Sequence, residues 1–442
     1  MWTPPASPRG SSSVTAPRLL DCLCNVIGNR RSDDILRGLS DADWREIAQL
    51  AARHGLQPLL YSRLASPSPA ARHVPADLLQ SLREAFLMNG TKNQLLYLDL
   101  ARVLSVLQQN GVGVIALKGA HLAELVYGTI ALRPMGDIDL LVGRHDLVKT
   151  AALLRDLGYT ADMSGLEIEE LVRGVYEKHL PSFFRPPHPR IEPHWSLSPE
   201  ASPENIDQLW KTAKPATLAG VPTRVLSPEC LLLHLCLHMR LHCLEMGLKP
   251  LCDIAVTLRR YRAVLDWKEV LSLAKAWHEE KSIYVALALT SDLLGEAVPE
   301  EVLQSLRPPD FEPRWLEQAR TLTLNPEPDA APRLYSLLEE WGSVPFSGKT
   351  RYLLRQAFPT REHMTCYMLQ HHSVPLTSTR KYTCYLTRAL DVAGHALRMV
   401  GRLAARGLFD RAETAAHLSR MRERALFGKW LNEHAAYNTE KP

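Results

Sequence analysis

Residues 114–142 read VIALKGAHLAELVYGTIALRPMGDIDLLV, and in this stretch the apolar pattern changes from helical to strand-like. It begins with a short apolar run at 114–117 and ends with Asp137–Val142, where two aspartates lead into a second apolar run. Both runs have the length and composition of buried strands. Lys118-Gly119 turns the chain out of the first run into a helix at 120–127. The stretch therefore predicts two strands with a helix between them.

Outside this stretch, apolar residues recur three and four positions apart, as they do in helices. We expect helices at 76–109, 146–157, 231–246, 251–261, 268–281, 351–358 and 386–408, and a further short strand at 190–195. Ser40 and Ser227-Pro228 are typical of helix starts. We divide the chain into a disordered tail at 1–17, a helical region at 18–110, an α/β core at 111–200, a helical domain at 201–310 and a C-terminal helical region at 311–442.

The composition is that of an ordinary globular protein. Of the 442 residues, 46% are apolar and 23% are charged, and the net charge is only +4. This charge gives no strong nucleic-acid signal. No pair of the eight cysteines has the CxxC spacing of a zinc finger, so we expect no structural zinc. No apolar run approaches the length of a membrane span, and the first residues lack a secretory signal, so we expect a cytoplasmic protein without a membrane partner.

Asp137 and Asp139 are the strongest candidates for a functional site. Alternate residues of a strand share a face, so both carboxylates project together. Two like charges on a half-buried strand repel each other and lose hydration, and a divalent cation relieves both costs. Mg²⁺ suits this place because it binds carboxylate oxygens together with substrate phosphates. The alternative is an edge strand whose aspartates face water.

Three nearby residues are candidates for binding phosphate. Lys118 and Gly119 lie between a strand and a helix, where a lysine and free backbone N–H groups attract phosphate. Arg133 lies four residues before Asp137, within reach of a triphosphate. A solvated loop residue is the alternative for Arg133.

The segment 115–142 resembles the bacterial "nucleotidyltransferase family protein" group of the polymerase-β-like nucleotidyltransferase superfamily. The resemblance rests on Leu117, Lys118, Gly119, Tyr127, Arg133 and Asp137–Val142, and it extends to IEPHWSL and to the histidine-containing helix near residue 234. It implies an α+β fold, in which a small mixed-sheet nucleotidyltransferase core is embedded in a largely helical chain.

The resemblance also implies a reaction. Asp137 and Asp139 would bind Mg²⁺ or Mn²⁺, and Glu192 would supply the third acid. The substrate would be an NTP, with ATP as the expected nucleotide, and an NMP would pass to an unidentified acceptor as pyrophosphate leaves. Pro193 lacks a backbone donor, so it fits only an edge strand or a bulge. The alternative function is a non-catalytic nucleotide-binding or scaffold protein with a degenerate site.

Two further features have competing interpretations. His234, His238 and His242 form one stripe along a helix, which either packs on the core or, together with Asp253, faces the cleft between the domains. The C-terminal helices carry basic residues that form either a solvated face or a surface for an acidic partner: Arg380, Lys381, Arg388, Arg398, Arg402 and Arg406.

Overall fold

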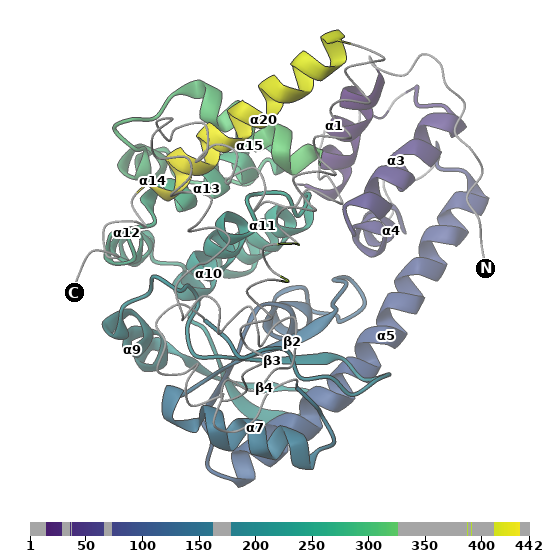
Figure 1. The fold of residues 1–442 in the computed structure, drawn as a ribbon. Coiled ribbons are helices and arrows are strands. Elements are labelled where there is room, and N and C mark those ends of the chain that lie inside the picture. The colour runs from purple at the N-terminus through teal and green to yellow at the C-terminus, as the bar shows by residue number, and fades with distance from the viewer. Residues whose placement is uncertain are drawn as a thin grey trace.

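The computed structural model of the chain consists of a small sheet and a larger body of helices (Figure 1). It describes residues 15–28, 36, 38–65, 73–161, 178–325, 387, 390 and 411–433. The basic C-terminal helices expected at 351–358 and 386–408 lie outside the described residues, apart from Thr387 and Leu390. In the described part, no helix is both long and apolar enough to cross a membrane.

Five strands form one mixed sheet in the order β3-β2-β1-β5-β4. They are β1 (Val114–Ala116), β2 (Asp137–Val142), β3 (Arg190–His194), β4 (Lys214–Leu218) and β5 (Val221–Val225). β1 runs antiparallel to β2 and parallel to β5, while β2 and β3 are parallel. The predicted α+β class and the small mixed sheet are therefore confirmed.

β2 lies between β1 and β3, so its backbone is paired on both sides. This arrangement excludes the alternative in which its aspartates lie on a solvated edge strand. β3 is the outer neighbour, as Pro193 requires. The N–H of Ile191 points outward and donates to the carbonyl of Phe183 at 3.0 Å. The nitrogen of Pro193, two residues later, faces the same way, so the proline removes no bond from the β2–β3 ladder.

The sheet has two differently covered faces because side chains alternate along its strands. Ile138, Leu140 and Val142 pack in a core formed with α5 (Ala76–Gln109) and α7 (Leu147–Asp156). Leu141 packs in the core of the helical body. Figure 1 shows α5 and α7 on one side of the sheet and the helical body on the other. Asp137 and Asp139 share the face of Leu141, so they look toward the helices.

The helices before the sheet form as the sequence predicts. They are α1 (Thr15–Ile27), α3 (Asp41–Arg53), α4 (Gln57–Ala65) and α5. Ser40 caps α3 in a reciprocal capping box with Asp43. α5 begins and ends at the two predicted residues, and its 34 residues reach from α4 to the sheet.

Several short elements lie in the connections between the strands. α6 (Lys118–His121), a π-helical turn (Leu122–Val126), a 3₁₀ turn (Arg144–Asp146) and α9 (Pro203–Thr212) join α7 in linking the strands. The sheet also continues beyond residue 200, where we expected the α/β core to end. β4 and β5 form a hairpin whose turn residues, Ala219 and Gly220, both have positive φ. An alanine there carries no clear turn signal, which is why the hairpin was missed.

The remaining helices form the helical body together with α1, α3 and α4. They are α10 (Pro228–Leu241), α11 (Lys249–Tyr261), α12 (Trp267–Ala276), α13 (Glu280–Leu294), α14 (Glu300–Leu306), α15 (Pro313–Leu324) and α20 (Arg411–Asn432). Within this body, α10 and α11 are the members nearest the sheet. Ser227 caps α10 with Pro228 in its first turn, as predicted. The single helix expected at 268–281 is wrong: α12 ends before His278, whose φ of 55° is left-handed, and α13 begins afterwards.

Candidate functional site

The pairing of β2 with β3 brings the predicted acids together. Asp139 lies opposite Glu192 in the register, and His194 lies opposite Leu141. Since alternate residues share a face, Asp139, Glu192 and His194 all project toward the helical body. Asp137, two residues before Asp139 on β2, projects from the same face. The sequence alone identified the acids but not their register, which depends on contacts between distant segments.

Asp139, Glu192 and His194 form a compact set of metal-ligand atoms. One atom from each lies within 4.8 Å of the others. Nε2 of His194 lies 2.9 Å from Oδ1 of Asp139 and 3.8 Å from Oε2 of Glu192. The hydroxyl of Ser182 donates to Oε1 of Glu192 at 2.7 Å and fixes that carboxylate. The sequence predicted no role for His194 at the site, although its place two residues after Glu192 on one strand was an available signal.

The acids influence one another's ionisation. Burial raises the pKa of Asp137, and the charges of Asp139 and Glu192 raise it further. Burial would also raise the pKa of Asp139, but Lys118 and His194 hold it well below its usual range. His194 lowers the pKa of Glu192. The three carboxylates therefore place a surplus of negative charge on a face that water reaches poorly.

Lys118 and Gly119 lie beside this group at the end of β1. Nζ of Lys118 is 3.3 Å from Oδ1 of Asp139. The backbone of Lys118 has a φ of 32°, which is strained for a residue with a side chain. A Cβ on Gly119 would lie 3.0 Å from both Nη1 of Arg133 and Cε of Met135. Gly119 is thus required for close packing, and its contact with phosphate stays a prediction.

Arg133 is not brought into the carboxylate group. Its Nε and Nη2 each donate to an oxygen of Asp253 on α11 at 2.8 Å. The hydroxyl of Tyr127 donates to the same carboxylate at 2.9 Å. Both partners are buried, so the pair joins the loop before β2 to the helical body. The predicted phosphate contact of Arg133 stays a prediction, and this buried ion pair argues against it.

The histidine stripe of α10 both packs in the core and faces the acids. His234 is 3% exposed, His238 is half-buried and His242 is exposed. Burial lowers the pKa of His234 and His238, and the charges of Lys118 and Asp139 act on both of them. The ring centroids of His238 and His242 are 4.5 Å apart. The stripe therefore both packs on the core and faces the acids. Asp253, which was expected to face the cleft with it, is instead bound by Arg133.

Several imidazoles near the acids have a ring nitrogen without a partner. Nδ1 is buried and unbonded in His194, His234 and His238, as judged over the described residues. The ring of His179 lies 4.8 Å from that of His194. Burial lowers the pKa of His179 to about 4, so this imidazole is neutral near pH 7. Burial also lowers the pKa of His234 and His238, so these neutral imidazoles add no positive charge to balance the carboxylates.

Lys249, the first residue of α11, is a further basic residue near Asp137. Its charge and that of Lys118 both lower the pKa of Asp137. Burial lowers the pKa of Lys249 to about 8, and the neighbouring Arg133 lowers it too. No pattern in the sequence singles out Lys249, because Asp137 is more than 100 positions away in the chain and no spacing rule connects them.

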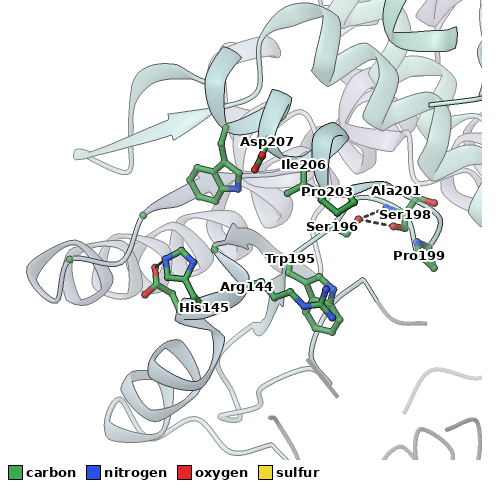
Figure 2. Close-up of a pocket in the computed structure, with 15 residues that line it drawn as sticks. Arg144, His145, Trp195, Ser196, Ser198, Pro199, Ala201, Pro203, Ile206 and Asp207 are labelled. Atoms are coloured by element: carbon green, nitrogen blue, oxygen red, sulfur yellow. Dashed lines mark hydrogen bonds and ion pairs between the residues drawn. The ribbon is translucent and has the colours of Figure 1, made fainter. Parts of the chain in front are cut away.

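A cavity of about 800 Å³ lies at the end of the sheet where β2 and β3 finish. Its wall includes Trp195, Arg144 and His145 (Figure 2). Trp210 also lines it. Asp139 and Glu192 do not line it. The side chain of His145 is 85% exposed, so this wall is solvated. Its size suits a ligand, but it lacks the buried charge of the carboxylate group.

The comparison with known proteins agrees with the geometry. Residues 40–295 match the family described as "Uncharacterised nucleotidyltransferase", and the chain belongs to this family. The match covers the sheet, α10, α11 and every candidate site residue. No curated protein and no solved structure matches the chain. The family therefore supports a nucleotidyl-transfer role in general, without naming a substrate.

Proposed function

We propose that the chain is a metal-dependent nucleotidyltransferase that moves an NMP from an NTP, with ATP as the first candidate, to an acceptor hydroxyl or phosphate. The observation that carries this proposal is the clustering of Asp139, Glu192 and His194 within 4.8 Å, beside Asp137. Such a concentration of buried acid is costly unless a cation neutralises it.

The donor set fits a divalent cation. Asp139 and Glu192 offer the carboxylate oxygens that Mg²⁺ and Mn²⁺ prefer, and His194 offers an imidazole nitrogen. Asp137 lies outside this compact set, but its carboxylate stands close enough for its pKa to be raised by both acids. When bound, the cation would neutralise phosphate charge and polarise the α-phosphate. Asp137, Asp139 and Glu192 would hold it.

The residues of the chain have distinct places in the proposed reaction. An acceptor oxygen forms a bond to the α-phosphorus, and the bond from that phosphorus to the pyrophosphate oxygen breaks. For a hydroxyl acceptor, we assign the released proton to Glu192, whose side chain is 19% exposed, against 3% for that of Asp139. Lys118 attracts the phosphates and orients Asp139. Most of the acceleration would come from positioning and charge neutralisation.

One observation favours the alternative, a non-catalytic nucleotide-binding protein. Lys118 and His194 both contact Oδ1 of Asp139, so this oxygen has polar partners before any cation binds. Such a protein would bind an NTP without releasing pyrophosphate. A catalytic protein would release one pyrophosphate for every NMP transferred.

The direct test is a transfer screen with α-labelled NTPs. The purified protein would be incubated with each NTP, with Mg²⁺ or Mn²⁺, and with pools of protein, peptide, sugar and RNA acceptors. We expect label on an acceptor and stoichiometric pyrophosphate. Nucleotide binding without either product, across all pools and both metals, would favour the non-catalytic alternative.

A further inference from the structure

Lys249 is held in a fixed place at the start of α11. Nδ1 of His54 accepts a hydrogen bond of 3.2 Å from the backbone N–H of Leu248. Gly247 has a φ of 74°, and a Cβ there would lie 2.6 Å from the same nitrogen of His54. Leu248 is thus bonded to the N-terminal helices, and there is no room for a side chain at Gly247. The position of the Lys249 backbone is therefore well determined.

Lys249 is half-buried, and the charges of Asp253 and Asp137 act on its ammonium group without pairing with it directly. Among the described residues, its one hydrogen bond is to the carbonyl of Pro134 at 3.2 Å, and it forms no ion pair. Asp253, on the same helix, is already bound by Arg133 and Tyr127. Desolvating a charge is costly unless an opposite charge compensates it. An anionic ligand would supply that compensation.

The surroundings of Lys249 indicate which anion it would meet. Its ammonium group donates to the carbonyl of Pro134, three residues before Asp137, so it lies beside the start of β2, where its charge and that of Lys118 act on the same acid. Lys118 already contacts Asp139, whereas Lys249 belongs to the helical body that covers this face of the sheet. A polyphosphate carries several negative charges, and the divalent cation proposed at the acids would attract it. Its outer phosphates would lie among these positive groups.

We infer that Lys249 contacts the β- and γ-phosphates of the nucleotide, so that the helical body supplies part of the triphosphate site. This inference rests on the proposed function for its ligand class. It assigns to Lys249 the phosphate role that the sequence predicted for Arg133, whose guanidinium is bound by Asp253.

The test is isothermal titration of the full-length protein with inorganic triphosphate, ATP and AMP, each with MgCl₂. For Lys249→Met, we expect the Kd of triphosphate and of ATP to rise about tenfold or more, which corresponds to about 1.4 kcal/mol. The Kd of AMP, which lacks the outer phosphates, should change much less. Methionine keeps the apolar length of the side chain and removes a half-buried charge that has no ion-pair partner among the described residues, so the melting temperature should not fall.

Lys268→Met is the matched control, because Lys268 is an exposed lysine of the same helical body and should leave all three Kd values unchanged. Unchanged triphosphate binding in Lys249→Met would overturn the inference. Equal weakening of AMP and ATP would do the same, as would a wild-type protein that binds no triphosphate. If the proposed function alone fails, triphosphate still binds through Lys249, but no pyrophosphate is released from ATP.

Discussion

Asp139 and Asp253 are both 2% exposed, yet their surroundings differ in the balance of charge. Asp253 meets one guanidinium in a two-point ion pair and one phenol hydroxyl, so its carboxylate is neutralised and fully bonded. Asp139 shares Lys118 and His194 with two further acids, Asp137 and Glu192. The charge of Asp253 is balanced by its partners, whereas the group around Asp139 retains negative charge.

This difference separates a structural role from the proposed functional one. A balanced buried pair can join two parts of a fold, as Arg133 and Asp253 join the loop before β2 to α11. An unbalanced group of acids stabilises nothing by itself and gains from a cation. The large cavity near Trp195 belongs to neither type, because it has volume without buried charge. Charge balance, more than volume, identifies the candidate site here.

The largest effect should follow from Asp139→Asn. The amide keeps the shape of the side chain but removes the charge that would hold the cation. We expect the transfer rate to fall about 1000-fold or more, which corresponds to about 4 kcal/mol of transition-state stabilisation. The unfolding free energy should stay within about 1 kcal/mol, because Asp137 and Glu192 no longer face a third like charge.

Labelled-nucleotide transfer and urea unfolding would measure these two quantities. Asp41→Asn is the control, since Asp41 is an exposed residue in the first turn of α3 and should leave both unchanged. Transfer by Asp139→Asn within threefold of the wild type would show that the acid is not part of the site.

Asp253→Asn should have the opposite profile, with the main loss in stability. The change leaves the buried guanidinium of Arg133 without its counter-ion, which should cost about 3–5 kcal/mol of unfolding free energy. Replacing both partners by apolar residues, Arg133→Met with Asp253→Leu, should recover much of that loss. Urea unfolding of the single and double variants would measure this. A single-variant loss below about 1 kcal/mol would mean that the pair is not structural.

A smaller, pH-dependent effect should arise at His54, which supports the start of α11 from the other side. Burial lowers the pKa of His54 to about 4, so the folded protein keeps this imidazole neutral. The unfolded chain protonates it near the ordinary pKa of about 6.5. Stability from this group is therefore complete above pH 6.5 and is lost as the pH falls toward 4, with about 2 kcal/mol lost at pH 5.

His54→Asn removes this titration and leaves an oxygen that can accept the N–H of Leu248. The difference in unfolding free energy between pH 7.5 and pH 5 should therefore be about 2 kcal/mol smaller in the variant than in the wild type. Equal pH dependence in both proteins would show that His54 is not kept neutral by the fold.

The local elements could be predicted from the sequence because their signals are local. The ends of α5 and β2 follow from apolar periodicity and from the residues that flank them. The β4–β5 hairpin was missed because Ala219 occupies a left-handed turn position that favours other residues. The break between α12 and α13 was missed because neither glycine nor proline marks it.

The acids of the candidate site could be predicted from the sequence, but the residues around them could not. Asp137, Asp139 and Glu192 lie on strands whose alternation can be read directly, and the structure places them on one face. The partner of Arg133 lies 120 residues away, so no local pattern reveals that its guanidinium is bound. Lys249 and the α10 histidines lie near the acids only because of how the helical body packs against the sheet, which no local pattern reveals either.

The most direct test of the unbalanced acid group is a thermal-shift titration with ATP, in Mg²⁺ and in EDTA. A site that binds nucleotide through a cation predicts that ATP raises the melting temperature only when Mg²⁺ is present. It also predicts that Asp139→Asn abolishes this shift while Asp41→Asn retains it. Equal stabilisation by ATP in EDTA and in Mg²⁺, or a full Mg²⁺-dependent shift in Asp139→Asn, would contradict nucleotide binding through a cation at the acid group.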